Sequence, residues 1–288
     1  MATTQTIESK HPSWQRVLLV AELFEAILLQ LPHRDLLLAQ AVSRHWRDTI
    51  LTSPRIQQKL FFQPVSNTNH GPELNPLLQW LLPPFFGPQI NAPYATTDAI
   101  ESFTPNDAIK NLGWYADQHY RDIVLRREAS WRRMYPVQPP ARIESSLKIG
   151  ECCLQEFYET PVEVKGHQRE LQQEGAQMGL LYDVIVHLLN ARKESLFRIR
   201  WLMFPISSRE DLGLFRYADD EKSEGEIRGG LKQANKISIH NYYQKRCGNR
   251  DNWDGCGLNP VEFGEDIVQY GERRRASDLY WYMEREYM

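Results

Sequence analysis

Residues 17–37 read VLLVAELFEAILLQLPHRDLL, and this stretch decides the fold of the N-terminal part of the chain. Its apolar residues recur at spacings of three and four, and these positions are Val20, Leu23, Phe24, Ile27, Leu28 and Leu31. Such spacing is the period of an amphipathic helix. Pro32 ends the helix, because a proline excludes the residue before it from helical geometry.

Three start signals follow, and each predicts a further short helix. They are Asp35 before residues 36–42, Ser43 before residues 44–51, and Ser53 with Pro54 before residues 55–62. Asp and Ser cap helices because their side-chain oxygens accept hydrogen bonds from first-turn N–H groups, and proline suits the first helical position. Residues 17–63 are therefore predicted to form a module of three or four helices.

This module carries more leucine than it can bury. Leu36, Leu37 and Leu38 cannot all face a core, because successive residues of a helix point about 100° apart. Three or four short helices also make a small core, which is marginal without a neighbour or partner. We expect part of the apolar surface to stay exposed until a partner covers it.

The module resembles an F-box. The residues that carry the resemblance are Leu31-Pro32, Asp35, Leu36-Leu37, Val42, Arg44, Trp46-Arg47 and Ser53-Pro54. Ala21 stands where F-boxes usually have a proline, and Ser43 where many have a cysteine. The resemblance implies docking on the Skp adaptor of SCF ubiquitin ligases. The adaptor-binding residues that it implies are Val20, Ala21, Leu23, Phe24, Ile27, Leu28, Leu31, Pro32, Leu36, Leu37, Val42 and Trp46.

Residues 64–113 are rich in proline and asparagine, yet the segment from Leu77 to Phe86 is strongly apolar. A flexible linker would lack such side chains. We therefore predict a structured connector whose residues 77–86 pack onto a flanking domain. These residues and the run Ser130-Trp131-Arg132-Arg133-Met134 also resemble the corresponding segments of fungal F-box proteins.

Residues 114–288 are predicted to form an α+β domain that recognises a substrate, after a polar arm over residues 1–16. Apolar residues recur with a helical period over residues 117–134 and 168–191. Apolar and polar residues alternate over residues 197–203 and 236–240, which predicts two strands. Residues 278–283 are predicted to form a short aromatic helix. The arginines of 117–134 either bind an anionic peptide or phosphate or form a solvated face. The predicted fold class is α+β and mainly helical.

No motif in the chain predicts catalysis or a cofactor. A nucleophile elbow, a phosphate loop and a paired-histidine zinc helix are all missing from the sequence. Gly225–Gly230 follows no predicted strand, and His240, Cys247 and Cys256 lack an obvious fourth zinc ligand. Cys152 and Cys153 have acidic neighbours, Glu151 and Glu156, which disfavour a reactive thiolate. We expect a non-catalytic protein with no metal and no cofactor.

Charge and hydropathy limit the partners. With a net charge of −3, the chain lacks the excess of positive charge that is typical of proteins that bind nucleic acid. The longest apolar stretch is interrupted by Glu22, Glu25 and Gln30, which argues against a membrane span. Residues 1–13 carry no apolar core of a signal peptide. We expect a cytoplasmic or nuclear protein that binds neither membrane nor nucleic acid.

Taken with the resemblance, these features predict a substrate-recruiting subunit of an SCF ubiquitin ligase, linked through a Skp-type adaptor to a cullin–RING ligase. The target protein and the residues that bind it are not disclosed by the sequence. Two alternatives stay open. The chain could act as an F-box protein outside ubiquitination, or it could be an interaction module that no longer binds the adaptor because of Ala21.

Overall fold

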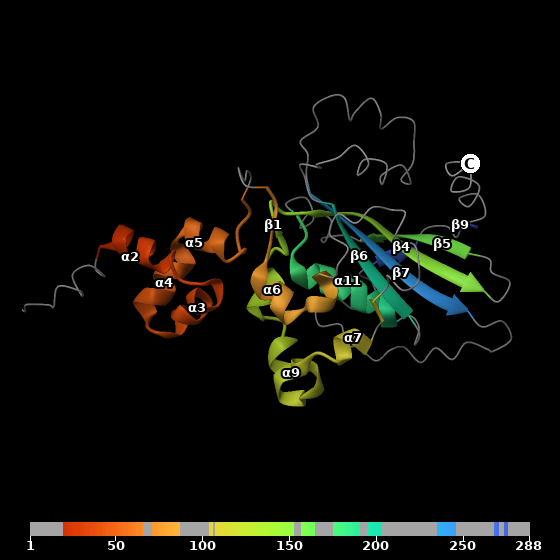
Figure 1. The fold of residues 1–288 in the computed structure, drawn as a ribbon, viewed down its shortest axis with the longest axis horizontal. Helices are drawn as coiled ribbons and strands as arrows, with labels where there is room; N and C mark the ends of the chain where they lie inside the picture. The colour runs from red at the N-terminus through yellow and green to blue at the C-terminus, as the bar shows by residue number, and fades with distance from the viewer. Residues whose placement is uncertain are drawn as a thin grey trace, which may run out of the picture. The chain divides into compact units, whose positions relative to one another are not determined.

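The computed structural model describes residues 20–65, 71–86, 104–105, 107–152, 157–164, 175–190, 195–202, 235–245, 268–270 and 274–275. The chain divides into two units, residues 1–63 and residues 64–288 (Figure 1). In the described ranges the first unit contains helices, and the second contains helices and a sheet. The protein is therefore mixed α+β.

The described part of the first unit, residues 20–63, contains five short helical segments. They are α2 (Ala21–Leu28), α3 (His33–Leu38), the 3₁₀ turn η1 (Ala39–Ala41), α4 (Arg44–Thr52) and α5 (Pro54–Lys59). Its core contains the fully buried side chains of Phe24, Leu28, Leu36, Ile50, Ile56 and Leu60. The first predicted helix is confirmed over Ala21–Leu28, and it ends before Pro32 as expected. Val20 is extended and precedes the helix, and residues 17–19 lie outside the described residues.

Two of the three predicted caps are confirmed. The Ser43 hydroxyl accepts a hydrogen bond from the Trp46 N–H at 3.3 Å, and the Ser53 hydroxyl accepts one from the Ile56 N–H at 3.2 Å. The prediction for Asp35 is wrong, because α3 begins two residues earlier, at His33. Pro32 has φ −55° and ψ 151°, so the proline is itself the non-helical residue that precedes the helix.

The last turn of α5 ends in an uncommon backbone conformation at Phe61. Phe61 has φ 62°, a region that costs a bulky residue roughly 1–2 kcal/mol. The turn is a Schellman motif, with the Phe61 N–H on the Gln58 carbonyl and the Phe62 N–H on the Gln57 carbonyl, both at 2.9 Å. The Phe61 side chain is buried. Burial of a phenylalanine contributes about 1.5–3 kcal/mol, which offsets the strain.

The second unit contains a seven-stranded sheet among the described residues, in the order β2-β6-β7-β4-β5-β8, with β9 also paired to β5. The strands are β2 (Thr104–Pro105), β4 (Arg142–Cys152), β5 (Phe157–Val164), β6 (Ser195–Leu202), β7 (Lys236–Lys245), β8 (Val268–Tyr270) and β9 (Arg274–Arg275). Strands β4 and β7 run parallel, and the other pairs are antiparallel. A separate ladder joins β1 (Glu73–Leu74) to β3 (Val137–Gln138).

Helix α11 (Met178–Asn190) packs on β6, on β7 and on the 3₁₀ turn η5 (Ser130–Arg133) (Figure 1). Phe197, Ile199 and Trp201 alternate along β6 and are buried. The predicted strand over 197–203 is thus confirmed, and the one over 236–240 extends to residue 245. The predicted helix over 168–191 is confirmed for Met178–Asn190. Residues 175–177 are not helical, and residues 168–174 and residue 191 lie outside the described residues.

The close approach of η5 to α11 depends on one glycine and one ion pair. A Cβ at Gly179 would lie 2.9 Å from the Arg132 carbonyl oxygen, so a larger residue would push the two elements apart. The Arg132 guanidinium donates a hydrogen bond to the Asp183 carboxylate, and both side chains are buried. Removing one partner of such a pair leaves an uncompensated buried charge, which makes the pair a strong constraint on this packing.

The predicted packing of the connector is confirmed. It forms α6 (Pro76–Leu81) and the 3₁₀ turn η2 (Pro83–Phe86). The Trp201 indole N–H donates to the Phe85 carbonyl at 3.1 Å, and the Phe85 ring lies 5.7 Å from the Tyr182 ring and 5.5 Å from the Phe197 ring. The connector therefore belongs to the core of the second unit, which begins at residue 64 instead of residue 114.

A buried asparagine anchors the start of α6. The Asn75 side-chain oxygen accepts hydrogen bonds from the N–H groups of Leu77 and Leu78, at 3.0 and 3.3 Å. Its amide nitrogen donates to the Tyr135 carbonyl at 3.2 Å, and its backbone N–H donates to the Pro136 carbonyl at 2.9 Å. Asn75 thus caps α6 and fixes it to the strand region of β3.

The predicted helix over 117–134 is wrong in its length. The structure has α7 (Asp107–Lys110), α8 (Gly113–Ala116), α9 (Gln118–Val124) and then η5. The chain turns back after α9, because the Trp131 indole donates to the Val124 carbonyl at 2.6 Å while Arg132 points inward to Asp183. Predictions for residues 1–16, Gly225–Gly230, Cys247, Cys256 and residues 278–283 lie outside the described residues.

Candidate functional site

The apolar side of α2 divides into a buried half and an exposed half. Its residues Leu23, Ile27, Phe24 and Leu28 span an arc of about 140° on the helix. Phe24 and Leu28 are fully buried, whereas Leu23 is 49% exposed and Ile27 is 43% exposed. Val20, which precedes the helix, is 43% exposed. The first helix therefore presents an apolar stripe to solvent, which we define as Val20, Leu23 and Ile27.

The structure separates the twelve predicted adaptor-binding residues into three groups. The exposed group is Val20, Ala21, Leu23, Ile27, Pro32 and Val42; the half-buried group is Leu31, Leu37 and Trp46; the buried group is Phe24, Leu28 and Leu36. The prediction is wrong in offering the buried group as contact surface. These three side chains form the core, so they support the module from inside.

Half-buried Trp46 lies between core and surface. Its ring meets the Phe24 ring edge-on, with 5.1 Å between centroids, and His45 stacks on the same ring at 5.0 Å. Phe24 is thus held between two aromatic side chains of α4. This packing fixes the rotation of α2 about its axis, and hence which of its residues face solvent.

The first unit exposes two further leucines that the predicted set omits, Leu38 on α3 and Leu51 on α4. The exposure of Leu38 could have been predicted from the sequence. When three leucines follow one another on a helix, at least one of them must point away from the core. The structure buries Leu36, half-buries Leu37 and exposes Leu38. Leu51 gave no signal in the sequence pattern.

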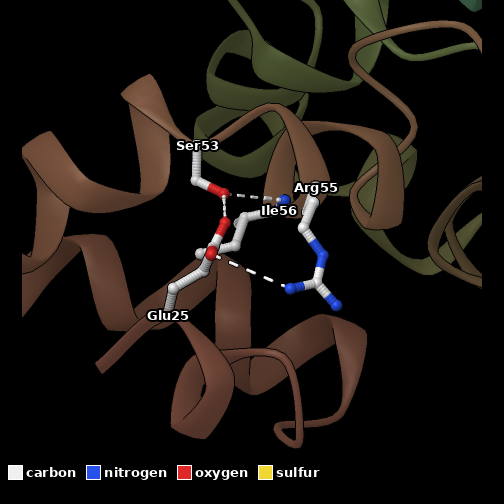
Figure 2. Close-up of polar contacts among 4 residues, drawn as sticks. All are labelled: Glu25, Ser53, Arg55 and Ile56. Atoms are coloured by element: carbon white, nitrogen blue, oxygen red, sulfur yellow. Dashed lines mark hydrogen bonds and ion pairs between the residues drawn. The ribbon is translucent and has the colours of Figure 1, made fainter. Parts of the chain in front are cut away.

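A polar cluster ties α2 to α5 (Figure 2). The Ser53 hydroxyl donates to the Glu25 carboxylate while it accepts the Ile56 N–H. The Arg55 guanidinium lies 3.9 Å from the other Glu25 oxygen. Arg55 is exposed, so this ion pair contributes only about 0–1 kcal/mol. The hydrogen bonds through Ser53 are the stronger constraint, because they also cap α5.

A second link holds the other end of α2. The Lys59 ammonium donates to the carbonyl of Leu29, the residue that follows α2. A cation at the C-terminal end of a helix also interacts favourably with the helix dipole. The two links hold α2 at Glu25 and Leu29, so the exposed stripe is presented by a fixed helix.

Ala21 is the first residue of α2 and is exposed. Val20, the residue before it, has φ −88° and ψ 107°, an extended conformation that suits a residue before proline. The first helical position also tolerates a missing N–H. The backbone at Ala21 is therefore compatible with a proline, although the chain has alanine.

The described ranges contain neither a cluster of metal ligands nor a helix fit to cross a membrane. No three His, Cys, Asp or Glu side chains in those ranges lie together as metal ligands would. None of the helices described there combines the length and the apolar character that a bilayer crossing requires. The side chains of His240, Cys247 and Cys256 lie outside the description.

Comparisons of the chain with protein-family models, with curated proteins and with solved structures found no match. The exposed stripe of α2 is an apolar surface that the described part of the chain leaves uncovered.

Proposed function

We propose that the chain is an F-box substrate receptor of a cullin–RING ubiquitin ligase. The first unit docks a Skp-type adaptor, and the second unit holds the target protein. The observation that carries the proposal is the exposed stripe of Val20, Leu23 and Ile27 beside Phe24 and Leu28, the two large apolar residues of α2 that are buried. Covering what is still exposed of each side chain contributes about 1 kcal/mol, roughly half of the value for full burial.

The stripe lies in the part of the chain that resembles an F-box. Pro32 and Val42, which belong to the same resemblance, are also exposed. The links of Glu25 to Ser53 and of Lys59 to Leu29 support the proposal, because a docking helix that is already fixed loses little entropy on binding. The proposed contact is thus preorganised.

In this proposal the chain itself carries out no chemistry. It holds a target near the ligase, which raises the effective concentration of the target and orients it. Catalysis belongs to the partner subunits. The docking surface is therefore the place where the proposal can be tested.

The alternative is an F-box protein that works outside ubiquitination or no longer binds the adaptor. The observation in its favour is Ala21, which removes the rigid proline from the exposed start of α2. An F-box protein that works outside ubiquitination would still bind the adaptor. The form of the alternative that has lost the adaptor differs from the proposal in one measurable property, the ability of the full chain to bind a Skp-type adaptor.

The test is co-purification of the full chain with a Skp-type adaptor. The double variant Leu23→Asp with Ile27→Asp should lose binding, because two charges would be desolvated at the contact. Leu51→Asp is the matched control, an equally exposed leucine of the same unit outside the predicted set, and it should bind as the wild type does. Leu36→Asp is unsuitable, because a charge in the core would unfold the unit.

Two outcomes would contradict the proposal. Unaltered binding by the folded double variant would mean that the stripe is not the docking surface. A wild-type chain that binds no Skp-type adaptor would favour the alternative. Circular dichroism of each variant establishes that loss of binding is not loss of fold.

A further inference from the structure

Residues 273–277 read RRRAS, a run of three arginines followed by alanine and serine. Ser277 has arginine two, three and four residues before it, and no other serine or threonine of the chain has arginine at both of the nearer two positions. Glu272 and Asp278 flank the run, outside the three arginine positions. Arginine at these positions is the charge pattern by which arginine-directed protein kinases select a serine, because each guanidinium pairs with carboxylates of the kinase.

Three further serines have an arginine three residues before them, and they are Ser130, Ser145 and Ser195. Ser195 is only 1% exposed and pairs with Tyr243 in the ladder of β6 and β7. Ser145 lies within β4, opposite Ser238 of β7, and half-buried Ser130 begins η5. A protein kinase binds the backbone around its serine as a separate extended segment, so each of these serines would first have to leave its ladder or turn. The structure therefore argues against all three as substrates.

Strand β9 contains two of the arginines that precede Ser277. It consists of Arg274–Arg275 and pairs antiparallel with β5 (Figure 1). Among the described strands, β5 is the one neighbour of β9, and the pairing covers two residues. The backbone of both arginines is thus already extended, as a kinase requires, and a ladder of two residues holds it only weakly. A segment that is preorganised in this way loses less entropy on binding.

A kinase that binds Arg274 competes with Glu159, which lies opposite Arg274 in the ladder of β5 and β9. Opposite charges across a ladder contribute less than hydrogen bonds between a guanidinium and a carboxylate, and a bidentate pair forms two of these. Arg275 lies opposite Tyr158, which is uncharged. Within the described ladder the competition therefore concerns one arginine and is the weaker of the two interactions.

We propose that Ser277 is phosphorylated by an arginine-directed protein kinase that recognises the arginines of residues 273–275. The Ser277 hydroxyl oxygen attacks the γ-phosphorus of magnesium-bound ATP, the bond from that phosphorus to the bridging oxygen breaks, and ADP leaves. The hydroxyl proton passes to the catalytic aspartate of the kinase. The product carries a phosphate with a charge of about −1.5 to −2 at neutral pH, two residues after β9.

The test is incubation of the full chain with magnesium-ATP and the catalytic subunit of cyclic-AMP-dependent protein kinase, followed by tandem mass spectrometry. The main phosphate should be located on Ser277, and Ser277→Ala should abolish its incorporation. The double variant Arg274→Lys with Arg275→Lys should lower kcat/KM at least about tenfold, because lysine keeps the charge but cannot form bidentate pairs. Arg142→Lys is the matched control, an exposed strand arginine three residues before Ser145, and it should leave the rate unchanged.

A synthetic peptide of residues 270–282 is the reference substrate, and the full chain should be phosphorylated at a comparable kcat/KM. A peptide that is phosphorylated while the full chain is not would overturn the proposal, because the fold would then hide Ser277. Incorporation at Ser130, Ser145 or Ser195 instead, or an unaltered rate in the double variant, would overturn it as well. Circular dichroism of each variant establishes that a lower rate does not reflect a changed fold.

This inference does not rest on the proposed ligase function, and the two fail separately. Ser277→Ala should co-purify with the Skp-type adaptor as the wild type does, because Ser277 belongs to the second unit and the docking stripe to the first. A chain that is phosphorylated at Ser277 but binds no adaptor would contradict the ligase function alone. A chain that binds the adaptor but takes no phosphate at Ser277 would contradict the phosphorylation site alone.

Discussion

Helices α2 and α11 are both rich in apolar residues, yet the protein covers them to very different extents. In α11 nearly every residue from Met178 to Leu189 is buried, including Asp183, because β6, β7 and η5 pack on it. In α2 only Phe24 and Leu28 are buried. The second unit thus supplies its own cover for its most apolar helix, and the first unit leaves half of an apolar side open.

The difference shows how an apolar pattern should be interpreted. Hydrophobic periodicity predicts that a helix buries one side, but it does not say what covers that side. In α11 the cover is a sheet of the same chain. In α2 the short helices α4 and α5 cover Phe24 and Leu28 only, which leaves the stripe of Val20, Leu23 and Ile27 for a partner in the proposed function.

The largest expected effect concerns the borders of the second unit. A fragment of residues 64–288 should unfold cooperatively on heating. A fragment of residues 114–288 should aggregate or melt without a cooperative transition, because it lacks Phe85, whose ring packs on Tyr182 and Phe197. Differential scanning calorimetry of both fragments makes the comparison. A sharp transition in the shorter fragment, at the same temperature as in the longer one, would show that the connector is dispensable.

The next effect compares the two halves of the apolar surface in the first unit. Leu36→Ala should lower the free energy of unfolding of this unit by about 2–5 kcal/mol, because it removes a buried leucine. Leu23→Ala should change it by no more than about 0.5 kcal/mol, because this leucine is exposed. Urea titration followed by circular dichroism measures both. An equal loss of unfolding free energy in the two variants would mean that Leu23 is part of the core.

A smaller effect is expected at the link between α2 and α5. Ser53→Ala removes the cap of α5 and the hydrogen bond to Glu25, and should cost about 0.5–2 kcal/mol. Ser43→Ala, which removes only the cap of α4, is the control and should cost less. Urea titration again gives the difference. If both substitutions lower the free energy of unfolding equally, the contact of Ser53 with Glu25 does not stabilise the attachment of α2 to α5.

Local signals in the sequence predicted local structure well. Ser43 and Ser53 were predicted as caps because a cap acts over three residues, and alternation predicted β6 because its period of two is contained in one strand. The failure at Asp35 was also local, since Pro32 supplies the non-helical residue before α3. Competing start signals a few residues apart cannot be ranked by pattern alone.

Long-range partners were the features that the sequence could not supply. The buried Arg132 was predicted in an amphipathic helical face, because its partner Asp183 lies 51 residues away. Strand β4 was missed, since its sequence RIESSLKIGEC shows no sustained alternation and its parallel neighbour β7 is distant in the chain. In the candidate site, periodicity identified α2 but could not separate Leu23 and Ile27 from Phe24 and Leu28.

The exposed stripe of α2 can be tested most directly by side-chain footprinting of the full chain with and without a Skp-type adaptor. Photochemical labelling detected by mass spectrometry reports how accessible each side chain is. The account predicts that the adaptor protects Leu23 and Ile27 from label while exposed Leu51 and Trp80 stay labelled. A complex in which Leu23 and Ile27 are labelled as strongly as in the free chain would contradict it.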